Sequence, residues 1–172
     1  MSEAIDEPIL IVAYDPQWPT RFERERVLLE RAVGPWIVGD VNHVGSTAVP
    51  GLDAKPIIDI LIGVENLAAS RACFEPLAEL DYLYAPYRAQ EMHWFCKPDP
   101  SRRTHHLHLV PVDSSRYRDE LAFRDRLLSD PEKARAYAAL KRRLAARFGH
   151  DREGYTDAKA DFIAGTLNDA EA

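Results

Sequence analysis

Three residues that could form a ligand site lie close together in the sequence: Gly45, Ser46 and Asp59. A glycine after a strand lets backbone N–H groups approach a phosphate, and a serine hydroxyl adds one more hydrogen-bond donor. Asp59 lies within an apolar run, where an unpaired carboxylate is costly. We therefore expect Asp59 either to meet a cation or to line a cleft. A structural salt bridge or a capping role is the alternative.

Two histidines form a second group with chemical potential. In a strand, His106 and His108 share one face with Thr104, so their rings project in parallel. Such a pair could bind one divalent metal with an acid as third ligand, although hydrogen-bonded structural histidines are the alternative. The preceding apolar run places Glu91 and His93 on one face, which would allow a larger polar cluster.

Three basic residues could supply positive charge to an anion held by the Gly-Ser pair. Lys55 lies between Ser46 and Asp59, and Arg102 and Arg103 come just before the histidines. Each of them could neutralise a bound phosphate. A solvated surface role is the alternative for each.

The elements that must position these residues follow from hydrophobic periodicity and from capping residues. A helix should begin near Asp15 and Pro16 and end at Gly34. Asn66 should cap a helix that reaches Leu80, unless Pro76 ends it early. Strands are expected at 9–13, 36–44, 57–64, 91–97 and 104–112, and C-terminal helices at 114–128, 129–149 and 156–167.

The run 57–64 is the strongest strand signal, because it is β-branched and apolar on both faces. We expect it to lie inside a sheet. Its alternation puts Asp59 and Leu61 on one face, and Ile58 and Ile60 on the other.

Length and composition fit one globular domain. The 172 residues are 46% hydrophobic and show no linker or repeat. We expect a single domain over 1–172, with a mixed α/β core over 1–112 and a helical cap over 113–172.

Net charge and cysteine content indicate which partners and which cellular compartment to expect. A net charge of -6 argues against a broad duplex-binding surface, so a nucleic-acid partner is not expected. Cys73 and Cys96 form no CxxC pair, which indicates small apolar side chains in a reducing compartment. The acidic N-terminus does not resemble a secretory peptide, and no apolar run is long enough to span a membrane. We therefore expect a cytoplasmic protein without membrane association.

Several blocks together resemble one family of bacterial proteins, the GrpB family. The blocks occur in the family's order and cover nearly the whole chain: YDPQWPTRFERE, HVGSTAVPGLDAKPIIDI, RTHHLHLV, LAFRDRLLSDPEKARAYAALKRRLA and YTDAKADFI. The family in turn resembles the nucleotidyltransferase superfamily. This resemblance implies an α+β fold, in which helices flank a mixed sheet and further helices form a C-terminal cap.

The resemblance also implies roles for individual residues. Gly45 and Ser46 match the superfamily's Gly-Ser element, and Asp59 matches the first acid of its Asp-x-Asp element. In those enzymes, acids hold two divalent ions that activate a hydroxyl and stabilise the leaving pyrophosphate. This sequence departs from the pattern, because Leu61 stands at the second acid and His108 near the third. Such a ligand set suits Mg²⁺ poorly, since Mg²⁺ prefers oxygen.

On this resemblance we expect a protein that binds a nucleotide or another phosphate ligand together with a divalent metal, Mg²⁺, Mn²⁺ or Zn²⁺. The residues expected to act are Asp59 and His108 in catalysis, Asp59, His106 and His108 as metal ligands, and Gly45, Ser46, Thr47, Lys55 and Arg103 at the phosphate.

Two other functions remain open at this stage. One is a non-catalytic helper module that acts through a protein partner, because segments resembling this family occur fused to dephospho-coenzyme A kinase. The other is a metal-dependent hydrolase that uses Asp59 and the histidines. Lys159 and Arg124 belong to the matching blocks and could reach the cleft, although surface salt bridges explain them equally well.

Overall fold

A five-stranded mixed sheet forms the centre of the protein in a computed structural model that describes residues 7–170. The strand order is β1-β2-β5-β4-β3. β2 and β5 run parallel, and the other neighbouring strands are antiparallel. The strands are β1 (Val41–Val44), β2 (Ile58–Val64), β3 (Leu83–Tyr84), β4 (His93–Asp99) and β5 (Arg102–Pro111).

The expected alternation along β2 is confirmed. Ile58, Ile60 and Ile62 point into the main core, whereas Leu61 packs in a smaller cluster on the opposite face. β2 pairs with β1 on one edge and with β5 on the other, so it lies inside the sheet as expected. Leu107 of β5 also enters the main core, which turns His106 and His108 to the opposite face.

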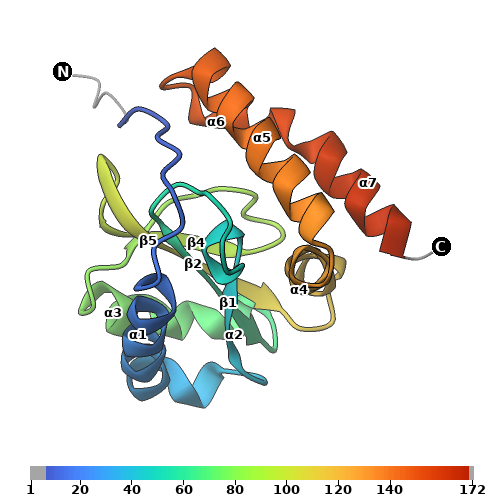
Figure 1. Ribbon diagram of the computed structural model, residues 1–172. Helices are drawn as coiled ribbons and strands as arrows, with labels where there is room; N and C mark the ends of the chain where they lie inside the picture. Colours follow the sequence, from blue (N-terminus) through green and yellow to red (C-terminus); the bar gives the residue numbers. More distant parts are fainter. Residues whose placement is uncertain (1–6, 171–172) are drawn as a thin grey trace.

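Helices cover the main-core face of the sheet. The long helix α1 (Trp18–Val33) packs on β1 and β2, and the short helices α2 (Leu67–Ser70) and α3 (Phe74–Ala78) follow β2. Asn66 caps α2 as expected, because its side chain accepts a hydrogen bond from the Ala69 N–H. Figure 1 shows α1 and α3 on one side of the sheet.

Four C-terminal helices lie on the other side of the sheet (Figure 1). Ser114 caps the first of them and Asp130 caps the second, each by accepting a backbone N–H. Tyr137 and Phe162 stack with ring centroids 5.2 Å apart, which joins the second helix to the fourth. The helices are α4 (Ser115–Ser129), α5 (Pro131–Phe148), α6 (Arg152–Ala158) and α7 (Ala160–Ala170).

Several predicted boundaries were wrong. The run 9–13 is not a strand, because only Val12 forms an isolated bridge, to Ala54. Helix α1 begins at Trp18, since the Asp15 carboxylate accepts the Gln17 N–H in the turn that precedes the helix. The strand expected over 36–44 is limited to Val41–Val44, because Gly34–Trp36 forms a 3-10 turn.

The third C-terminal helix is in fact two helices. The predicted span 156–167 is interrupted at Lys159, which lies between α6 and α7. The two-residue strand β3 was not predicted, because its pairing with β4 has no periodic signal in so short a segment. Over the part of the chain that the structure describes, none of the helices is long and apolar enough to cross a membrane.

Candidate functional site

The Gly-Ser turn and Asp59 are in direct contact. Antiparallel pairing of β1 with β2 places Val44 opposite Asp59, and the chain then turns at Gly45 with φ of +72°. A Cβ atom at position 45 would lie 2.5 Å from Asp59 Oδ2. Only glycine tolerates both this backbone conformation and this approach. Ser46 follows directly in the turn, and its hydroxyl accepts a hydrogen bond from Lys141.

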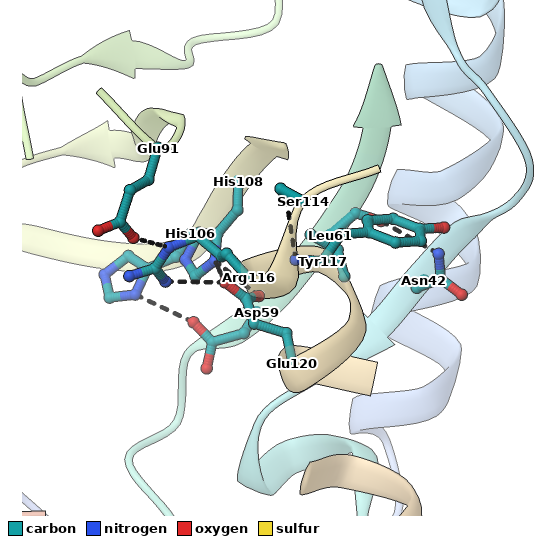
Figure 2. Close-up of polar contacts among 10 residues, drawn as sticks. All are labelled: Asn42, Asp59, Leu61, Glu91, His106, His108, Ser114, Arg116, Tyr117 and Glu120. Carbon is teal, nitrogen blue, oxygen red and sulfur yellow. Dashed lines mark hydrogen bonds and ion pairs between the residues drawn. The ribbon is translucent and has the colours of Figure 1, made fainter. Parts of the chain in front are cut away.

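Asp59 pairs with His106. The parallel register of β2 and β5 sets the two residues side by side, and His106 Nδ1 lies 3.1 Å from Asp59 Oδ1 (Figure 2). Burial opposes ionisation of Asp59, but the hydrogen bond and charge of His106 outweigh it and hold the carboxyl pKa at about 2. Burial lowers the pKa of His106 to about 4 against the pull of Asp59.

These pKa values define the protonation of the pair near pH 7. Asp59 is ionised and His106 is neutral, so the Nδ1–H of His106 donates to the carboxylate. His106 Nε2 then carries the lone pair, and no described residue donates to that buried atom. The Asp59 side chain is 29% exposed, so the pair is accessible from solvent on the carboxylate side. An imidazole held in this way can accept a proton.

His108 does not join this pair. Its Nδ1 lies 3.0 Å from the Glu120 carboxylate of α4, which also accepts a hydrogen bond from Arg116 at 3.1 Å (Figure 2). Burial lowers the pKa of His108, but the Glu120 charge outweighs it, and the net shift is upward. Arg116 also donates to Glu91 at 2.6 Å. The cluster is therefore a chain of ion pairs that raises the pKa of His108.

The polar cluster differs in two ways from the one expected from the strands. Glu91 joins it through Arg116, but His93 faces the main core. His93 hydrogen-bonds to the Leu67 carbonyl at 2.8 Å and packs edge-on against Phe74. Glu120 was not predicted, because its approach to His108 depends on how helix α4 packs against β5.

Three lysines gather around Ser46 and Asp59. Lys141 of α5 is 2% exposed, and its ammonium donates to Ser46 Oγ at 2.7 Å and to the Asp53 carbonyl. Lys159 and Lys55 both lie over the Tyr155 ring, at 4.4 and 4.9 Å from its centroid. Lys55 comes from the loop before β2, and Lys159 from the break between α6 and α7. We call Lys55, Lys141 and Lys159 the lysine cluster.

The electrostatics of the lysine cluster show a shortage of negative charge. Burial, followed by the charge of Lys55, lowers the pKa of Lys141 and of Lys159 to about 7 each. Burial also lowers the pKa of Lys55. Asp59 acts on all three in the opposite direction, and Asp53, which is itself paired with Arg142, acts in that direction on Lys141. Like charges held together out of water favour the binding of an anion.

Sequence reasoning found two members of this cluster and missed the third. Lys55 was a candidate, and Lys159 was considered against a surface role. Lys141 was not considered, although Tyr137 and Lys141 lie one helical turn apart on the buried face of α5. The available signal was a lysine at a position of the helical repeat that faces the core, since lysine is rarely fully buried without a partner. Arg124, which was considered together with Lys159, does not belong to the lysine cluster and donates to the His43 carbonyl at 3.2 Å.

The two remaining phosphate candidates lie differently. Thr47 is 2% exposed, and its hydroxyl lies 2.8 Å from His43 Nε2, so its contact is with β1. Arg103 donates to the Pro100 carbonyl at 3.0 Å, and its guanidinium lies over Trp94. Its charge contributes to lowering the pKa of Lys55, after burial and the charge of Arg152. Arg103 therefore borders the site, and Thr47 supports the turn.

A two-ion metal centre does not fit the side chains found here. Leu61 is fully buried in an apolar cluster, where the superfamily pattern has its second acid. The Asp59 carboxylate is hydrogen-bonded to His106, and His108 is hydrogen-bonded to Glu120. Within residues 7–170, no three His, Cys, Asp or Glu side chains are grouped as a metal site requires. Binding of Mg²⁺, Mn²⁺ or Zn²⁺ stays a prediction.

The site is not one of the two hollows described on this surface. One hollow lies between the 49–53 loop and helices α4 and α5, and the other lies between α1 and β1. Neither is lined by Asp59 or by the lysine cluster. The site is therefore defined by Ser46, Asp59 and the lysine cluster. Neither of these hollows is the cleft that the sequence predicts.

Comparison with known proteins establishes the family. The family model described as GrpB protein matches residues 8–169, so the chain belongs to the GrpB family. A UPF0157 protein of Pseudomonas aeruginosa is 39% identical over 176 residues, which cover 99% of this chain and 71% of that protein. The glutamate-rich protein GrpB of Alkalihalophilus pseudofirmus is 34% identical, covering 94% of this chain and 95% of that protein.

The solved structure of a GrpB protein confirms the fold class. The crystal structure of the conserved protein GrpB from Enterococcus faecalis has a TM-score of 0.83 and 31% identity, and covers 94% of this chain and 96% of that one. A cytoplasmic RNA terminal U-transferase has a TM-score of 0.48 and 12% identity, covering 77% of this chain and 40% of the other. The GrpB family assignment and the α+β fold with its helical cap are therefore confirmed.

Proposed function

We propose that this GrpB-family protein binds a phosphate-bearing small molecule, of which nucleotides are the first class to test, at the lysine cluster. The observation that carries the proposal is the grouping of three lysines near Asp59: Lys141 donates to Ser46, and Lys55 and Lys159 both lie over the Tyr155 ring. A phosphate there would supply the missing negative charge and raise the lowered pKa values of Lys141 and Lys159.

The contacts suggest a role for each residue. The Ser46 hydroxyl and the backbone of the Gly45 turn would donate to phosphate oxygens, as in other glycine-rich anion sites. Lys141 already holds Ser46 and would bridge it to the ligand. Lys55 and Lys159 would contribute charge from two separate segments of the chain, with the ammonium group of each over the Tyr155 ring.

Nucleotidyl transfer, the reaction that the family resemblance implies, stays a prediction. The neutral His106 held by Asp59 has a free lone pair on its buried Nε2, so it would accept a proton only from a substrate group that reaches this atom. His108 was the sequence-based candidate for this role. Its contact with Glu120 raises its pKa, and its charge when protonated contributes to lowering the pKa of Asp59.

Thermal unfolding in the presence of ligands tests the binding proposal. Purified chain would be melted with a panel of nucleotides, with orthophosphate and with tripolyphosphate. A ligand at about a hundredfold excess over its dissociation constant should stabilise the fold by about 2.7 kcal/mol. The matched pair of variants is Lys159→Met, in the cluster, and Lys133→Met, whose lysine pairs with the exposed Asp169 on the surface.

We expect a ligand-dependent rise in melting temperature that Lys159→Met abolishes and Lys133→Met preserves. An equal loss in both variants would show non-specific charge attraction and contradict the proposed site. No rise with any phosphate-bearing ligand would contradict the proposed function itself.

A second candidate is a helper module that acts on a protein partner. A dephospho-CoA kinase of Mycolicibacterium paratuberculosis is 31% identical over 179 residues, which cover 88% of this chain but 43% of that protein. The same kind of domain thus occurs within a longer protein. Adding the purified chain to a dephospho-CoA kinase should then change that enzyme's rate or thermal stability, and no change in either would contradict this role.

A further inference from the structure

The neighbourhood of Asp59 offers few ligands to a divalent cation. Asp59 is the carboxylate closest to the Gly45 turn, and its Oδ1 is bonded to His106. The residue two positions further along the strand is Leu61, with no exposed surface. Its methyl groups pack among Val44 and other apolar side chains, so this strand position cannot present an oxygen.

The neighbouring histidines are also engaged. His106 Nδ1 donates to Asp59, and His108 Nδ1 pairs with Glu120. The Glu120 carboxylate is shared in turn with Arg116, which reduces its capacity for a metal. A cation that bound here would have to break ion pairs that neutralise buried charges, which costs several kcal/mol in typical proteins.

The lysine cluster opposes a divalent cation at the same place. The charge of Lys55 lowers the pKa of both Lys141 and Lys159. All three lysines are close enough to Asp59 for its charge to act on their pKa values. A further two positive charges would increase this repulsion. The positive charge that a metal ion brings to a bound phosphate chain is here supplied by side chains.

The lysine cluster also indicates the size of the anion. Its members come from three separate segments, and two of them lie on the same Tyr155 ring while the third holds Ser46. A single phosphate carries at most two charges near pH 7, whereas a condensed phosphate chain carries more and has oxygens for several ammonium groups.

We infer that this site takes a condensed phosphate chain, such as the triphosphate of a nucleotide or an inorganic polyphosphate, in its metal-free form, with Lys55, Lys141 and Lys159 in place of metal ions. The inference rests on the proposed function, since it specifies which phosphate ligand the site selects. Asp59 then acts as the counter-charge of the empty site and as the residue that positions His106. It does not hold a metal.

Calorimetric titration with inorganic tripolyphosphate tests the inference without assuming a base or an acceptor. The wild-type chain would be titrated first in EDTA and then in saturating Mg²⁺, with orthophosphate as the comparison ligand. We expect tripolyphosphate to bind in EDTA about tenfold more tightly than orthophosphate. Mg²⁺ should weaken this binding by about tenfold, because it removes charge from the ligand.

Asp59→Asn separates the two modes of binding further. In the metal-free mode, Asp59 repels the ligand, so the variant should bind tripolyphosphate at least as tightly as the wild type. A metal ligand at this position would produce the opposite result, a loss of binding. Lys159→Met should lose binding and Lys133→Met should keep it, which locates the ligand at the lysine cluster.

The possible failures can be told apart. Binding that requires Mg²⁺ or Mn²⁺ would overturn the metal-free part of the inference and leave the proposed function standing. Equal affinity for orthophosphate and tripolyphosphate would overturn the condensed-phosphate part and likewise leave the proposed function standing. Absence of binding in every condition would overturn both. The wild-type titrations decide between these outcomes even where Asp59→Asn folds poorly.

Discussion

Replacing Lys159 by methionine should make the protein more stable while it removes ligand binding. Burial and the charge of Lys55 lower the pKa of Lys159 from the ordinary value of 10.5 to about 7. A shift of this size corresponds to an upper limit of about 5 kcal/mol of unfavourable free energy in the folded state. Methionine keeps the length of the side chain and removes the charge.

The expected net gain is smaller than this limit. Lys159 keeps some exposure, and the variant loses a cation–π contact with Tyr155 of about 1 kcal/mol. We therefore expect Lys159→Met to raise the free energy of unfolding by about 1 to 3 kcal/mol near pH 7. Urea denaturation of the wild type, Lys159→Met and Lys133→Met measures the difference. The Lys133 control should change by no more than about 0.5 kcal/mol.

The pH dependence follows from the direction of the shift. Between about pH 7 and pH 10.5, the unfolded chain binds more protons at this position than the folded chain, so wild-type stability rises with pH. Below pH 7 both states are protonated, and the full penalty is present. The advantage of Lys159→Met should therefore be largest at pH 7 and below, and should fade toward pH 10. A destabilised variant, or a gain that does not depend on pH, would refute this reasoning.

Three further changes test other parts of the site. Gly45→Ala should destabilise the fold by about 1 to 3 kcal/mol, because its Cβ would meet Asp59 at a positive φ; a melting temperature equal to wild type would contradict the contact. Glu120→Gln should lower the pKa of His108, since the carboxylate holds it above the ordinary value, and NMR titration of the ring protons would show an unchanged pKa if the ion pair were unimportant. Leu61→Asp should cost several kcal/mol in urea denaturation, because position 61 is fully buried, and should create no Mn²⁺ affinity in calorimetry.

Some features of the site were predictable because they depend on local chemistry. The Gly45–Ser46 pair marks a turn that other residues cannot make, and strand alternation places Asp59 and Leu61 on one face whatever surrounds them. Asn66 was identified as a helix cap for the same reason, since a cap involves residues only a few positions apart.

Other local predictions failed where a weak signal met tertiary contacts. The apolar run 9–13 resembles a strand, but Ile9 packs with Leu144 and Tyr155 of the C-terminal helices and does not enter the sheet. The break at Lys159 was also missed, because the helical pattern continues through it. A hydrophobic pattern predicts that a segment is buried, but it does not predict which neighbouring element the segment packs against.

The family, the α+β class, the turn and the carboxylate were thus contained in the sequence alone. Only the tertiary structure brought Lys55, Lys141 and Lys159 around Ser46 and joined His108 to Glu120. Lys141 lies on a helix that packs across the chain from Ser46, and no periodicity or spacing encodes such a contact. The charge balance of the site, which determines the ligand it can accept, is a sum over these distant residues and therefore exists only in the folded chain.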